Sequence, residues 1–190
     1  MPEGLQVTGR GCLIQASVCR PKRDLRSESN AKEISDGLPF LEYELHRLLI
    51  NKLKVKGMNA IFGLKATVTV GEKMMALIAT GTAVFLAALP PPSIPKIVAG
   101  NSWHDTDKLA ELQKMIQDTV ERNREIYQIK NYMQELDLNN KPTSDNSDDS
   151  EDELVKEIDY ALGNKETCVL EVDDIQDLEV ISMLMVSYIV

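Results

Sequence analysis

Three cysteines and two histidines are the side chains best suited to metal-ion or thiol chemistry, and they are scattered along the chain. They are Cys12, Cys19, Cys168, His46 and His104. No two cysteines show the CxxC spacing of a zinc site, and neither histidine stands at ligand spacing from a cysteine or a carboxylate. We predict no metal site. The histidines should lie at the surface, and the odd number of thiols should stay reduced in a cytosolic protein.

Catalytic and phosphate-binding patterns are also missing from the sequence. The glycines of GLKATVTVGEK (63–73) have the wrong spacing for a phosphate-binding loop, and no GxSxG motif occurs. Acidic pairs such as Asp148 and Asp149 stand in a polar run where nothing would shift their pKa values toward acid–base catalysis. The same run, DNSDDSEDE (145–153), lacks the central glycine of a calcium loop. The sequence predicts no enzyme, no catalytic residue and no cofactor.

Two serines in the acidic run are candidates for phosphorylation. Ser150 is followed by Glu151, Asp152 and Glu153, the context that acid-directed kinases modify, and Ser147 is the weaker candidate. The competing interpretation is that the run is only a solvated spacer.

The elements that would position any site are organised around residues 58–89, the most apolar stretch of the chain. Up to Val70, apolar residues alternate with polar ones, which predicts a strand with one buried face. Gly71 and Glu72 then supply a reversal, and residues 74–89 are apolar on both faces. The stretch predicts a long antiparallel hairpin whose second strand needs cover on both sides. A membrane-spanning helix is disfavoured, because 16 uncharged residues fall short of the ~18 to 20 that a bilayer requires.

A strand and a helix should precede this hairpin. GCLIQASVC (11–19) predicts the first strand, and a polar segment (20–37) follows as a loop or disordered insert. Residues 38–56, closed by Gly57, predict a helix with one apolar stripe: Leu41, Leu45, Leu48, Leu49 and Leu53. The order predicts an α+β fold, a small β-α-β-β unit with a three-stranded antiparallel sheet. One helix covers only one face of that sheet, so later residues or another subunit should cover the other.

Composition divides the whole chain into six segments. They are a disordered N-terminus (1–10), the β-α-β-β domain itself (11–90), a Pro-rich linker (91–104), a long amphipathic helix (105–136), an acidic disordered linker (137–158) and the start of a second, truncated module (159–190). In the last of these we predict a strand at 167–172 and a helix capped by Asp173 or Asp174. One strand and one helix cannot form a domain, so we expect the chain to be a fragment with an unfinished second module.

The charge of the chain is uneven. Its formal net charge is −9; residues 1–65 carry 11 basic and 7 acidic side chains, whereas residues 66–190 carry 10 basic and 23 acidic ones. An acidic half without a basic stripe argues against a nucleic-acid partner. Near the end of the predicted helix, Lys52, Lys54 and Lys56 complement the helix dipole; contact with anionic lipid is the less favoured alternative.

Several long runs of residues resemble a known family, animal C2 domain-containing protein 5. They are PFLEYELHRLLINKLKVKGMNAIFGLKATVTVGEKMMALIATGTAVFLAALP (39–90), GCLIQASVCR before it and TCVLEVDDIQDLE after it. GMNAIFGL and ATGTAVFLAALP are the most specific parts. The core is also similar to bacterial YbjQ-like modules, sometimes called heavy-metal-binding domains. The shared features are the strand order, Asn59 and Ala60 at the entry of the second strand, and the GTAV run (81–84).

This resemblance implies a small α+β unit that assembles into oligomers, in a non-enzymatic cytosolic protein peripheral to the plasma membrane and vesicles. It further implies a role in vesicle traffic and in insulin-stimulated delivery of a glucose transporter. In that family, calcium and phospholipid binding belong to a C2 domain whose pattern this sequence lacks, so neither is expected of any residue here. We expect self-association or a protein partner and no transmembrane segment. The alternative is an oligomeric module that binds a metal or a small ligand, like the bacterial proteins.

Overall fold

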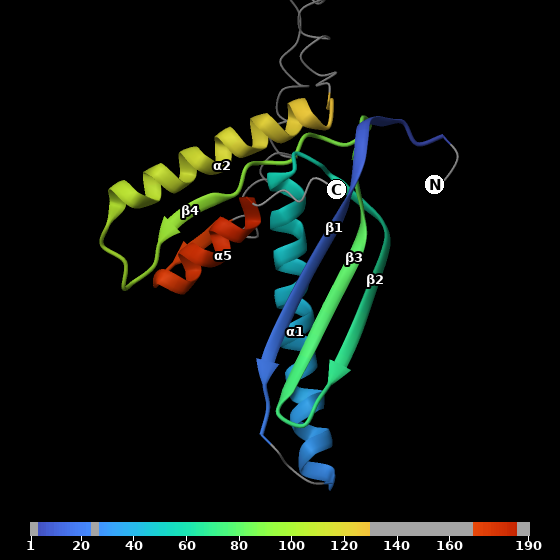
Figure 1. Cartoon of the computed structure of the whole chain (residues 1–190), viewed down its shortest axis with the longest axis vertical. Helices are drawn as coiled ribbons and strands as arrows, with labels where there is room; N and C mark the ends of the chain where they lie inside the picture. The colour runs from blue at the N-terminus through green and yellow to red at the C-terminus, as the bar shows by residue number, and fades with distance from the viewer. Residues whose placement is uncertain (1–3, 24–26, 130–168, 186–190) are drawn as a thin grey trace, which may run out of the picture.

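The computed structural model describes residues 4–23, 27–129 and 169–185. Its elements, in chain order, are β1 (Val7–Pro21), α1 (Ser27–Val55), β2 (Ala60–Val70), β3 (Met74–Leu86), β4 (Lys96–Ala99), α2 (Thr106–Ile126), β5 (Val169–Val172) and α5 (Ile175–Met185). They form two sheets, one of three antiparallel strands and one of two parallel strands (Figure 1). The α+β class and the hairpin predicted from the alternation of apolar residues are confirmed.

The first unit consists of a three-stranded sheet with α1 lying along one face. The strand order is β1-β3-β2, so that β3 is central and β1 and β2 are the edges. Alternate residues of β1 and β3 point toward α1 and meet its leucine stripe. The residues that these three elements contribute to this core are Ile14, Ala16, Val18, Leu41, Leu45, Leu49, Leu53, Met75, Leu77, Ala79, Ala83 and Phe85. The predicted apolar stripe is therefore the part of α1 that holds this core together.

Both β1 and α1 are longer than predicted. β1 already begins at Val7, inside the expected disordered N-terminus, and ends at Pro21. α1 begins at Ser27, so much of the segment expected to be a loop (20–37) is helical, and Pro39 lies inside the helix. The extra turns are held by contacts with other elements, which the periodicity of the sequence does not reveal. Ile34 and Leu38 pack against the core.

Polar bonds tie the same turns to the end of β1. Lys22 Nζ donates to Asn30 Oδ1 at 2.7 Å, and the backbone N–H of Arg23 donates to Glu33 Oε1 at 3.1 Å. Gly37 allows close packing, because a Cβ there would stand 2.7 Å from Met75 Cε. The first turns of α1 thus depend on the strand beside them rather than on their own sequence pattern.

The second unit is made of β4, α2, β5 and α5. β4 lies in the segment expected to be only a linker (91–104), and it pairs in parallel with β5, the strand predicted at 167–172. The predicted C-terminal strand and helix therefore have partners within the described chain. The core of this unit contains Val55 of α1 together with Ile97, Leu109, Leu112, Ile116, Val120, Leu170, Val172, Leu178, Ile181 and Leu184. Leu48 of α1 packs against both cores, so this helix serves both units.

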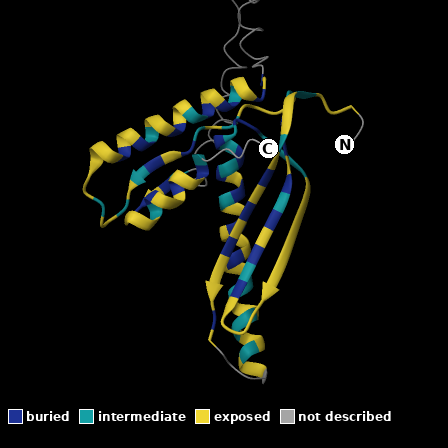
Figure 2. Cartoon of the chain, viewed as in Figure 1, coloured by how far each residue is buried: buried dark blue, intermediate teal, exposed yellow. Residues whose placement is uncertain are grey.

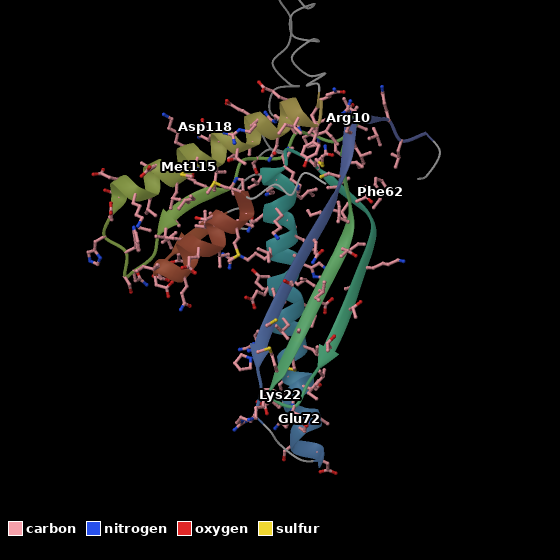
Figure 3. The ribbon with its side chains drawn as sticks, in the orientation of Figure 1. Arg10, Lys22, Phe62, Glu72, Met115 and Asp118 are labelled. Carbon is pink, nitrogen blue, oxygen red and sulfur yellow. The ribbon has the colours of Figure 1, made fainter. Side chains whose placement is uncertain are left out.

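α2 ends ten residues before the predicted helix end, because the chain turns back onto the first unit. The turn passes through Gln128, which has a φ of 55°. Tyr127 and Ile129 then enter the core beneath α1. The carbonyl of Tyr127 accepts a 2.7 Å bond from the N–H of Arg10, beside the end of α2 (Figure 3). Asn123, only 2% exposed, donates from Nδ2 to the carbonyl of Val55 at 2.9 Å.

Close backbone approach fixes this junction. A Cβ at Gly9 would lie 2.8 Å from the carbonyl oxygen of Gln128. Gly9 also has a φ of 73°, a backbone conformation that residues other than glycine rarely adopt. The acidic linker (137–158), the end of the predicted helix beyond Ile129 and Cys168 lie outside the described residues.

Tyr127 should give the junction a distinct alkaline response. Its burial, with the Cys12 thiol beside it as a lesser cause, raises the pKa of Tyr127 to about 12. An unfolded tyrosine ionises near pH ~10, so the unfolded chain releases this proton first and stability falls between the two values. Urea unfolding from pH 9 upward should therefore show a steeper loss of stability for the unaltered chain than for Tyr127→Phe. Parallel pH profiles for the two proteins would contradict this assignment.

Candidate interaction surface

The most unusual surface of the first unit is the edge strand β2. Every residue from Gly63 to Val70 is exposed, although Leu64, Val68 and Val70 are large and apolar, with exposed fractions of 43%, 49% and 43%. Figure 2 shows this strand exposed along most of its length, beside β3, in which buried and less buried residues alternate. An apolar row of this kind on an edge strand is an interaction site or a liability for aggregation.

This row lies on the same face of the sheet as the core. Val68 pairs with Leu77 and Val70 with Met75, and both partners are buried beneath α1. Residues directly opposite each other in an antiparallel pair point to the same side. We call Leu64, Ala66, Val68 and Val70 the β2 stripe. It continues the core face of the sheet beyond the reach of α1, and Ile61, nearer the start of β2, is the residue that packs against the core.

The opposite edge of the sheet is better protected. Besides the bond between Arg10 and Tyr127, Lys52 Nζ donates to the carbonyl of Gln15 on β1 at 3.0 Å. Burial, followed by the charge of Lys56, lowers the pKa of Lys52. The ammonium of Lys56 lies 3.4 Å from the hydroxyl of Tyr127. The lysines at the end of α1 thus help to cover β1. No described residue covers the apolar row of β2 in the same way.

The face of the sheet away from α1 is open as well. Ile78 in β3 is 44% exposed and Leu13 in β1 is 65% exposed. Thr80 of β3 and Thr67 of β2, which pairs with Ile78, lie on the same face. The second cover expected for β3 is not supplied by the elements that the structure describes, since α2 and α5 pack on the other unit.

The metal-type side chains stay apart in the described chain. His46 and His104 are exposed, and each has its Nδ1 beside a backbone carbonyl, of Glu42 at 2.9 Å and of Ser102 at 3.1 Å. Within residues 4–23, 27–129 and 169–185, no three His, Cys, Asp or Glu side chains are grouped closely enough to hold a metal ion. Cys12 instead lies with its Sγ 3.7 Å from Met58 Sδ.

Other predicted features lie where the structure gives no test. Ser147 and Ser150 are outside the described residues, so phosphorylation there stays a prediction.

The structure does describe one of the remaining cysteines: Cys19 is exposed near the end of β1. None of the described helices has the length and hydropathy needed to cross a bilayer.

Asn59 closes the end of the hairpin opposite its turn. Its Oδ1 accepts a 2.7 Å bond from the N–H of Leu86, and its Nδ2 donates to the carbonyl of Leu86 at 3.0 Å. The same Nδ2 lies 3.3 Å from the carbonyls of Leu89 and Pro90. The side chain therefore acts as one more residue of β2 paired with β3, and it holds the chain where it leaves the sheet.

Gly81 explains a second feature of the same region. A Cβ at this position would stand 2.7 Å from Cγ2 of Ile61 and 3.3 Å from the carbonyl oxygen of Phe62. The pairing of β2 with β3 shifts between Phe62 and Lys65, and Gly63 there has a φ of 62°. A bulge in β2 thus crosses over Gly81, and only a residue without a side chain fits beneath it.

Comparison with known proteins places these features in a family. The family described as "C2 domain-containing protein 5, YbjQ-like domain" matches residues 1–92. Residues 1–92 belong to that family. Two of the features on which the resemblance rests thus have a structural role. Asn59 closes the hairpin of this YbjQ-like domain, and Gly81, the first residue of the GTAV run, leaves room for its bulge.

Curated relatives extend the similarity beyond the YbjQ-like domain. C2 domain-containing protein 5 of Homo sapiens and of Pongo abelii are each 41% identical over 197 residues, covering 97% of this chain and 20% of the relative. The Xenopus tropicalis protein of that name is 37% identical over 196 residues, covering 97% of this chain and 19% of the relative. The chain therefore spans about a fifth of the length of the curated relatives it matches. No solved structure matches.

Substitution of Asn59 should weaken the YbjQ-like domain. Asn59→Ala leaves the N–H of Leu86 without its partner in a largely buried place, so we expect the free energy of unfolding to fall by about 1–3 kcal/mol. Urea denaturation followed by circular dichroism measures this change. Asn101→Ala, at an exposed position outside the sheet, is the control and should stay within about 0.5 kcal/mol. Equal effects of the two substitutions would show that the bonds of Asn59 add nothing.

Proposed function

We propose that this chain is a non-enzymatic interaction module that self-associates through β2. The observation that carries the proposal is the β2 stripe, an apolar row that continues the core face of the sheet and is left exposed. A protein that remained a monomer would keep this row in water next to an unpaired strand edge. Natural sheets avoid that combination by charges, prolines or cover. Here the stretch from Ala60 to Val70 contains one charged residue, Lys65, and no proline.

A second copy of the chain is the partner that fits this edge. Two β2 strands can pair antiparallel about a two-fold axis perpendicular to the sheet, which joins the two sheets into one. That arrangement places the two β2 stripes side by side on the α1 side, between the two copies of α1. Each stripe then buries the other, and the edge amides and carbonyls of both strands find partners. Lys65, Thr67 and Thr69 face the other side and stay in solvent.

At the level of the cell, we propose that the chain contributes this interface to a protein of vesicle traffic, peripheral to vesicles and the plasma membrane. The finer proposal is a part in calcium- and phospholipid-linked transport and in insulin-responsive delivery of a glucose transporter. The support for it is the family of the YbjQ-like domain and the similarity to relatives whose name includes a C2 domain. The module would supply association between copies, and lipid and calcium recognition would lie elsewhere.

The proposed interface predicts a specific loss of self-association. Val68→Lys puts an ammonium group in the middle of the β2 stripe, where pairing would bury it, so we expect at least about a tenfold weaker dimer. Light scattering after size exclusion should give twice the chain mass of 21.2 kDa for the unaltered protein. The variant should approach the monomer mass at the same concentration.

Thr67→Lys is the matched control for this experiment. It adds the same charge at the neighbouring position of β2, which is also exposed, but on the face that pairing leaves in solvent, so association should persist. A monomeric unaltered chain, or equal dissociation of the two variants, would contradict pairing through the β2 stripe.

The cellular proposal has its own test. A fluorescently tagged chain, expressed in insulin-responsive cells, should collect on compartments that contain the insulin-responsive glucose transporter. Val68→Lys should reduce this enrichment if copies bring one another to the vesicle. An even distribution through the cell, unchanged by insulin, would refute the trafficking role and leave the dimer measurement unaffected.

A further inference from the structure

A second exposed apolar surface lies on the other unit, in a groove between α2 and α5. We define the α2–α5 groove by Lys108 and Leu112 of α2 and by Ile175, Leu178, Glu179 and Met183 of α5. Leu112 and Leu178 are buried and form its floor, and its volume is about 510 Å³. Figure 1 shows α2 and α5 running on either side of β4, and both helices pack on the core beneath them.

The walls of the groove are apolar and exposed. Ile175 is 69% exposed and Met183 58% exposed. On α2, Met115 is 46% exposed; it follows Leu112 by three residues and so extends the same face. Methionine side chains are unbranched and adaptable, and they are over-used on surfaces that bind apolar faces of other helices. The groove therefore has the composition of a surface that receives a helix.

Two glutamates and one lysine lie in or beside the groove. Glu179 lines it, Glu111 is exposed one turn from Lys108 and Met115, and α5 carries no basic residue. The one lysine of the groove, Lys108, has its ammonium 5.7 Å from the centre of the Trp103 ring. A partner with Lys or Arg beside its apolar residues would complement this rim. A second copy that met this groove through its own groove would bring two glutamates and one lysine, and so less positive charge than such a partner.

A strand is a less suitable occupant than a helix. The free edge of β4 is already bonded by a side chain: the N–H of Ile97 donates to Gln113 Oε1 at 2.8 Å, and Gln113 Nε2 donates to the carbonyl of Pro95 at 3.1 Å. This amide takes the place that an added strand would occupy. The α2–α5 groove is therefore better suited to a helix than the edge of β4 is to an added strand.

We propose that the α2–α5 groove binds an amphipathic helix whose apolar stripe is flanked by lysine or arginine. The apolar stripe of such a helix contacts Ile175 and Met183, as well as Met115, and its basic residues lie against Glu111 and Glu179. This surface is separate from the β2 stripe, so one chain can associate with a copy of itself and hold a helix of another protein at the same time.

The test uses the whole chain and a dye-labelled amphipathic peptide of leucine and lysine, about 18 residues long or roughly five helical turns. Fluorescence anisotropy should show saturable binding that weakens with added salt, as expected for partly exposed charges. A leucine–glutamate peptide of the same pattern should not bind. No saturable binding of the lysine peptide, or equal binding of the glutamate peptide, would overturn the proposal.

Two variants with the same charge change locate the site. Met183→Lys puts a charge in the groove and should weaken binding at least about tenfold. Val180→Lys adds the same charge to α5 at an exposed apolar position that does not line the groove, and it should change the affinity by less than about twofold. Circular dichroism checks that both variants fold. Equal weakening by the two would mean general attraction to an acidic surface and would overturn the site.

Two further results would assign the groove to another occupant and so refute the proposal. One is dimerisation of the chain that Met183→Lys abolishes and Val68→Lys does not. The other is binding of the lysine peptide only after residues 186–190 are removed, which would mean that the chain's own end fills the groove.

Discussion

The width of a helix compared with the width of a sheet is the constraint on which the first unit depends. An α-helix with its side chains is about 10–12 Å across, and neighbouring strands are about 4.8 Å apart. One helix lying along three strands can therefore bury the inner face of about two of them. α1 lies over β1 and β3, where the core residues gather, and β2 remains outside its reach. The exposed stripe is thus a geometric result of covering three strands with one helix, and the proposed pairing of copies is its remedy.

The two edges of the sheet solve this problem differently. At β1, the chain uses its own later residues, because the end of α2 returns and inserts Tyr127 and Ile129 into the first core. The YbjQ-like family covers residues 1–92, yet the core of that unit includes side chains as far along as Ile129. The physical domain is therefore larger than the family segment. At β2, no described element returns, and the proposed pairing of two copies would supply a strand from outside the chain.

How far the sequence predicts this structure depends on the range of the interactions. Strict alternation before Val70 and the reversal at Gly71 are local signals, and the hairpin they predict is present. The first turns of α1 have few apolar residues and depend on β1, so the local pattern suggested a loop. β4 has only four residues, and its partner β5 lies about seventy residues away, which no periodicity can indicate.

The candidate surfaces were predictable only in part. The alternation identified one apolar face on β2, but it could not show whether α1 would cover that face. The need for a second cover was inferred for β3, whereas the larger exposed apolar row is on its neighbour. The α2–α5 groove had no sequence signal, because its walls come from helices that the fold brings together. In the sequence, Asn59 and Gly81 stand out only as parts of a family-like run, and the structure supplies their physical roles.

One helix takes part in both hydrophobic cores, since Leu48 contacts each of them and Val55 belongs to the second. Loss of either core would leave apolar residues of that helix in water and weaken the other. The two sheets should therefore melt together in one cooperative transition, and the amides in the middle of the shared helix should be among the slowest in the protein to exchange with deuterium. Any change that lowers the stability of one unit would then also lower the stability of the other, because the two units share α1.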